Sequence, residues 1–171
     1  MPFRAVNRRG WPGHDPGLQR HHLLPRELLT HSAFRRMFMQ GSAKRRSFDD
    51  FRDNGLLLPC RESAALRMGL PLHRGPHRHY NAMVIERVGQ IEGEWTTLRP
   101  RDDAAAAAQV QWRLALLQRA LRRFLLDGRR RRLLLNRQDP LGAGINYSDL
   151  DVVAEALWGA SGSPHRDKEA A

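Results

Sequence analysis

Cysteine is nearly absent from this 171-residue chain, in which Cys60 is the only one. A single cysteine excludes an intramolecular disulfide and the paired CxxC ligands of a zinc finger. Stability must therefore come from the core or from ligands other than thiolates, which fits a reducing compartment. Hydrophobic residues make up 41% of the chain, enough for the modest core of one compact domain with an appendage.

Long hydrophobic runs are also missing. No stretch approaches the ~20 apolar residues that span a bilayer. The first residues, MPFRAVNRRGWPG, contain no apolar segment of signal-peptide length. We therefore expect no membrane partner, and a protein that is cytoplasmic or exported by a dedicated secretion system without a classical signal peptide.

Lysine is the third scarcity, because Lys44 and Lys168 are the only lysines among 29 basic residues. The others are arginines, and the net charge is +11. The planar guanidinium group binds phosphate through paired hydrogen bonds. This excess therefore favours a polyanionic partner, most commonly nucleic acid. An arginine-rich composition inherited from a GC-rich genome is the alternative explanation of the charge.

Prolines, glycines and apolar periodicity divide the chain into expected elements. A strand over 18–24 ends before Pro25, a helix covers 25–41, and a polar loop ends in an Asn54-Gly55 turn before a short buried strand. Helices follow from Pro76, from Asp102 or Asp103 to Gly128, and near the C-terminus. We therefore expect an α+β protein with four parts: an irregular basic lead-in (1–17), a core (18–98), a helical C-terminal extension (99–160) and a disordered tail (161–171).

Two adjacent histidines, His21 and His22, lie near the end of the first expected strand. Neighbouring side chains on a regular strand point to opposite faces, so both cannot bind one metal there. Where the strand bends toward Pro25, one could bind a metal while the other acts as a general base, a role that suits the pKa of histidine. Two surface imidazoles on a basic protein would give the same pattern.

A second group of histidines lies in the segment LHRGPHRHYN. His73 and His77 are spaced to hold a divalent metal on one helix face, or His73 could reach the same point from just before a helix that begins near Pro76. Asn81, one turn after His77, is a reserve ligand. His79 faces away by roughly 200°, and we expect it at the surface or on a phosphate. A histidine-rich basic face is the alternative interpretation.

A hairpin followed by a helix would bring the two histidine groups to one point. A metal there would stabilise charge on a scissile phosphate and its leaving oxygen, while a neutral imidazole takes a proton from attacking water. Beside an arginine-rich surface, this arrangement favours hydrolysis of a phosphodiester bond.

Three motifs in order, HHLLP, NGLLLP and LHRGPHRHYN, resemble the AHH group of HNH/endonuclease VII-like nucleases. This group is part of the His-Me finger or ββα-metal superfamily, and the resemblance covers about residues 14–95. It implies a small treble-clef-like core of a hairpin plus a helix, with a helical insert and C-terminal helices. It also implies a metal-dependent endonuclease, often the toxic module of a bacterial toxin or effector. We expect low sequence specificity.

The resemblance also implies roles for individual residues. His22 would be the general base, and Asn54 would brace the loop that orients it. Arg20 replaces the alanine of the group's name and could contact phosphate. The ligands of one divalent metal, which could be Mg, Mn, Zn or Ni, would be His21, His73 and His77.

Two other functions fit the same residues. The first is a non-catalytic nucleic-acid-binding protein with a structural zinc site on the same histidines. The second is an arginine-rich helical interaction protein that binds no stoichiometric metal. As partners we expect nucleic acid, DNA rather than RNA, and an immunity-type inhibitor protein could bind the C-terminal helices. One arginine run is either a solvated face or a nonspecific phosphate-binding surface: Arg129, Arg130, Arg131 and Arg132.

Overall fold

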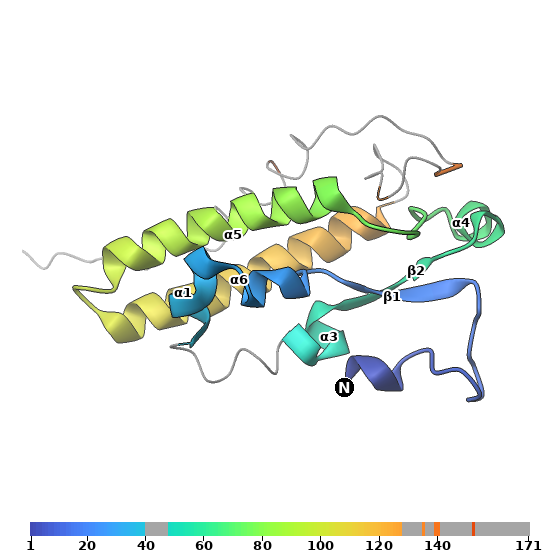
Figure 1. The fold of residues 1–171 in the computed structure, drawn as a ribbon, viewed down its shortest axis with the longest axis horizontal. Coiled ribbons are helices and arrows are strands. Elements are labelled where there is room, and N and C mark those ends of the chain that lie inside the picture. The colour runs from blue at the N-terminus through green and yellow to red at the C-terminus, as the bar shows by residue number, and fades with distance from the viewer. Residues whose placement is uncertain (40–47, 128–134, 136–138, 141–151, 153–171) are drawn as a thin grey trace, which may run out of the picture.

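The structure is a computed structural model that describes residues 1–39, 48–127, 135, 139–140 and 152. The chain folds as an α+β protein in which a two-stranded sheet lies beside two long helices (Figure 1). The arginine run 129–132, the expected C-terminal helix except for Val152, and the expected tail 161–171 lie outside the described residues. None of the described helices is long and apolar enough to cross a membrane.

The sheet joins two short strands that are far apart in the sequence. Strand β1 (Leu18–His22) pairs antiparallel with β2 (Gly55–Pro59), and the register places His22 opposite Gly55. The apolar residues of β2 are largely buried, which explains why this short LLLP run forms a strand. The pairing brings the tandem histidines next to the segment that follows Asn54.

The two long helices, α5 (Arg78–Leu98) and α6 (Asp103–Leu126), lie side by side (Figure 1). The expected cap of α6 is confirmed, because the Asp102 carboxylate accepts a hydrogen bond from the Ala105 N–H at 2.8 Å. Both helices contribute to one hydrophobic cluster, which also includes residues of β2 and of the insert between the strands. From α5 and α6 its buried members include Val84, Val88, Ile91, Val110, Leu117 and Leu121.

The expectation of one continuous helix over 25–41 is wrong. The described part contains three short pieces: η2 (Arg26–Leu29), η3 (Ser32–Phe34) and α1 (Arg35–Met39). His31 is extended, with ψ of 122°. In a continuous helix, Leu28 and Phe34 would lie roughly 120° apart around the helix axis. The break at His31 allows both side chains to enter the core, where they are buried.

Asn54-Gly55 is not the turn that the sequence predicted. Asn54 is the last residue of the short helix α3 (Phe51–Asn54), which Asp50 caps by accepting a hydrogen bond from the Arg52 N–H at 2.9 Å. Gly55 begins β2 with an ordinary extended φ of −110°. A turn is therefore not the reason for glycine at this position. After β2 comes helix α4 (Glu62–Met68), which is absent from the elements expected from the sequence.

Candidate active site

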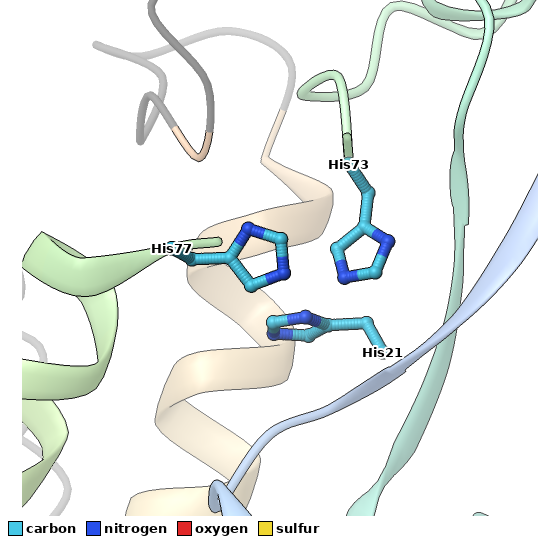
Figure 2. A group of neighbouring side chains, drawn as sticks. All are labelled: His21, His73 and His77. Carbon is cyan, nitrogen blue, oxygen red and sulfur yellow. The ribbon is translucent and has the colours of Figure 1, made fainter. Parts of the chain in front are cut away.

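Three histidines from separate segments converge beside the sheet. His21 comes from β1, His73 from the segment before α5, and His77 from the N-cap position of α5, and their rings turn toward one another (Figure 2). Their candidate ligand atoms all lie within 4.8 Å of one another. The His73 backbone N–H donates to the Pro59 carbonyl at 2.6 Å, which ties the segment before α5 to the end of β2. His73 thus reaches the group from outside the helix, one of the two arrangements considered from the sequence.

Two of these rings have a buried nitrogen without a hydrogen-bond partner among the described residues: Nε2 of His21 and Nδ1 of His77. Nδ1 of His73 lies 3.2 Å from the Gln19 side-chain oxygen, so as a donor it leaves Nε2 as the lone-pair nitrogen. Buried polar atoms rarely stay unpaired in folded proteins. A divalent cation would satisfy these nitrogens, so the donor set fits a metal.

Burial keeps the three imidazoles neutral. It lowers the pKa of His21 well below its ordinary value, and the neighbouring charges of His73 and His77 lower it further. Burial, followed by the charges of His77 and His22, lowers the pKa of His73 to about 4. Burial also lowers the pKa of His77, although a hydrogen bond with the Leu135 backbone opposes this shift. Neutral imidazole is the form that binds metal.

His22 is not one of the three converging histidines. It is half-buried at the end of β1, where its ring stacks on Phe3 with centroids 3.7 Å apart. Its Nε2 is buried and has no hydrogen-bond partner in the part of the chain that the structure describes. Burial and then the charge of Arg26 lower its pKa, which Asp49 partly opposes. The tandem pair thus places one imidazole in the converging group and the other beside it.

Asn54 is fully buried and holds the chain that leaves β1. Its Oδ1 accepts a hydrogen bond from the Leu24 N–H at 2.7 Å, and its Nδ2 donates to the Leu24 carbonyl at 3.0 Å. Its backbone carbonyl accepts from the Leu23 N–H at 2.8 Å. These bonds fix the two residues after His22. Asn54 is therefore placed to act on the position of His22 through the backbone.

Sequence reasoning missed two residues around this site, Gln118 and Gln19, and assigned no role to Tyr80 of the LHRGPHRHYN motif. Gln118 of α6 donates to Oδ1 of Asn54 at 3.2 Å, and the Tyr80 hydroxyl donates to the Leu23 carbonyl at 2.7 Å. Gln118 lies 64 residues after Asn54, and no local pattern links positions so far apart. Gln19 did have a signal, because it lies two residues before His21 and so on the same face of β1.

The remaining candidates lie at the surface. The Asn81 amide, on the first turn of α5, donates to the Glu27 carboxylate at 2.8 Å. His79 is exposed. The Arg20 guanidinium donates to the Phe3 carbonyl at 2.8 Å, so this arginine ties the N-terminal segment to β1.

The α+β fold thus brings together three imidazoles that could hold a divalent metal. Comparison with sequence models of known families identifies the family. Residues 3–121 match AHH, a nuclease family of the HNH/ENDO VII superfamily with conserved AHH, and the chain belongs to this family. The tandem histidines His21 and His22, preceded by Arg20, lie within the matched range. Comparison with curated proteins and with solved structures gave no match.

Proposed function

We propose that this protein is a divalent-metal-dependent endonuclease that hydrolyses phosphodiester bonds with low sequence specificity. The observation that carries the proposal is the convergence of His21, His73 and His77, with ligand atoms within 4.8 Å of one another, next to a fourth histidine in a chain of this nuclease family. Strands β1 and β2 and helix α5 would form its ββα-metal core.

In this proposal the three converging histidines hold the metal and His22 is the general base. The bound cation supplies Lewis-acid stabilisation of charge on the scissile phosphate and on the leaving oxygen. Because Nε2 of His22 is covered, the proton of the attacking water goes to Nδ1. The lowered pKa of His22 keeps the imidazole neutral at pH 7 and able to accept that proton.

The donor set favours a borderline transition metal. Neutral imidazoles suit zinc and nickel, whereas magnesium and manganese prefer oxygen ligands. Within the described residues, the group of metal-binding side chains contains three histidines. Three protein ligands leave a coordination position for water or phosphate, as in catalytic zinc sites, whereas structural zinc sites have four. Among the described residues, the number of ligands matches the catalytic type of site.

A cleavage assay tests the proposal. Supercoiled plasmid and single-stranded RNA are each incubated with the full chain under three conditions. These are the protein alone, the protein with chelator, and the chelator-treated protein to which zinc, nickel, magnesium or manganese is added back. We expect cleavage to stop in chelator and to return with zinc or nickel. His22→Ala should reduce cleavage by about 100-fold or more and leave metal affinity unchanged.

His31→Ala is the matched control, because His31 is an exposed histidine on the insert between β1 and β2. This variant should cleave at the normal rate. Full cleavage by His22→Ala would remove the base assignment. Cleavage by metal-free protein would overturn the metal dependence. Loss of the fold in chelator, without any cleavage when metal is present, would instead support the structural-zinc alternative.

The net charge of +11 supports a nucleic-acid substrate, and we favour DNA over RNA. Three further points stay predictions. The protein would act as a bacterial toxin, it would be bound by an immunity-type inhibitor, and it would be cytoplasmic or exported by a dedicated secretion system.

A further inference from the structure

The N-terminal segment provides an aromatic ring for His22. Phe3, in the 3-10 turn η1 (Phe3–Ala5), stacks on the imidazole with ring centroids 3.7 Å apart and an interplanar angle of 4°. A nearly parallel stack at this distance opposes rotation of the imidazole about its side-chain bonds. Phe3 is the only ring that stacks on His22 within the described residues.

Contacts on several sides hold Phe3 in place. Phe51 of α3 packs edge-on against its ring, with centroids 5.1 Å apart and an interplanar angle of 74°. The Phe3 carbonyl accepts the Arg20 guanidinium at 2.8 Å. The neighbouring backbone is tied to α3, because the Phe51 N–H donates to the Met1 carbonyl at 2.7 Å. Phe3 is thus anchored both to the strand that carries His22 and to the helix that precedes β2.

Gly55 closes this set of contacts. It pairs with His22 in the sheet, and a Cβ atom at this position would lie 2.1 Å from Cδ2 of Phe51. The Phe51 ring therefore occupies the space that a side chain at position 55 would need. The contacts run from His22 to Phe3, to Phe51, to Gly55 and back to His22 across the strand pair.

We infer that Phe3 and Phe51 form an aromatic clamp that positions the His22 imidazole for proton transfer. Both are positioning residues, since they act through His22 and not on the substrate. The inference rests on the proposed role of His22 as general base. It gives the N-terminal segment a role in positioning His22, and it gives Arg20 a structural role through its hydrogen bond to the Phe3 carbonyl. The phosphate contact considered for Arg20 from the sequence stays a prediction.

Substitutions at Phe3 in the full chain test the clamp. The measurements are kcat and KM for plasmid cleavage, the dissociation constant for zinc, and thermal melting. Phe3→Ala should lower kcat by about 10-fold or more, because small misplacement of a catalytic group is costly. KM and zinc affinity should stay within about twofold. Phe3→Tyr and Phe3→Trp should restore kcat, whereas Phe3→Leu, which fills space without a flat ring, should not.

Phe38→Leu is the matched control, because Phe38 is also half-buried but packs edge-on against Phe34 and Phe48; it should leave kcat unchanged. Full activity of Phe3→Leu, equal losses in kcat and zinc affinity, or faster cleavage by Phe3→Ala would overturn the clamp. The His22→Ala variant separates the two proposals. If it is inactive and Phe3→Ala is fully active, the clamp alone fails. If His22→Ala is active, the assignment of the base fails.

Discussion

At the scale of single residues, Gln19 decides which nitrogen of His73 faces the converging histidines. Its side-chain oxygen lies 3.2 Å from Nδ1 of His73, which favours the tautomer with a proton there and leaves Nε2 as a ligand. Partners of this kind orient metal-binding histidines, and their loss costs about 10–100-fold in metal affinity. We therefore expect Gln19→Ala to weaken zinc binding by about 10-fold in a calorimetric titration.

The control for this effect is Gln109→Ala. Gln109 bonds Glu94 at 3.3 Å near the other end of α5, and its replacement should leave zinc affinity unchanged. Gln19→Glu keeps an oxygen acceptor and should retain the affinity. Equal affinity of the Gln19→Ala variant and the unmodified chain would show that His73 needs no partner.

At the scale of elements, the junction of α3 and β2 requires a residue without a side chain. In Gly55→Ala the new methyl group would meet the Phe51 ring at 2.1 Å, so the ring has to move. Overpacking of this kind typically costs about 1–3 kcal/mol. We expect Gly55→Ala to lower the free energy of unfolding by that amount, measured by urea denaturation. The same change should cost less when it is made in the Phe51→Ala variant than in the unmodified chain, because the two residues share one contact.

Gly89→Ala is the matched substitution on α5. A Cβ atom there meets nothing within 4 Å, so alanine should stabilise the helix by up to about 1 kcal/mol. If Gly55→Ala were equally harmless, the close packing of Phe51 on β2 would not matter for stability.

At the scale of the whole molecule, the converging histidines link stability to pH. The pKa values of His21, His73 and His77 are lowered in the folded state from an ordinary value of 6.5, that of His73 to about 4. Between pH 6.5 and about pH 4 the unfolded chain therefore binds more protons than the folded chain. The free energy of unfolding of the metal-free protein should therefore fall as the pH drops below about 6.5, and continue to fall toward pH 4.

The measurement is urea denaturation of metal-free protein between pH 7.5 and 4.5. Each histidine that stays neutral in the folded protein changes the free energy of unfolding by at most about 1.4 kcal/mol per pH unit. His73→Asn removes one such group, so the free energy of unfolding of this variant should depend less steeply on pH. Zinc should raise stability at pH 7.5 and lose its effect in acid, because protons compete for the same nitrogens. A stability that is constant from pH 7.5 to 5 would contradict the burial of neutral imidazoles.

The sequence by itself indicated the two strands, the two long helices and the histidines with metal-binding potential. The period of the apolar residues marked α5 and α6, the pair Asp102-Asp103 marked the start of α6, and the LLLP run marked β2. These signals are local, because helix capping and apolar periodicity depend on residues within a few positions. Strand geometry also indicated that His21 and His22 could not share one metal.

Only the tertiary structure decided which side chains meet. The helix expected over 25–41 broke at His31 because burial of Leu28 and Phe34 outweighed local helix preference. The Asn54-Gly55 pair had the composition of a turn, but Asn54 bonds the chain after His22 and Gly55 makes room for Phe51. The bond from Asn54 to Leu24 joins residues 30 positions apart, and the ring of Phe51 is held against Gly55 by the folded structure around it. These contacts depend on packing and hydrogen bonding in the folded core, which short-range sequence patterns do not encode.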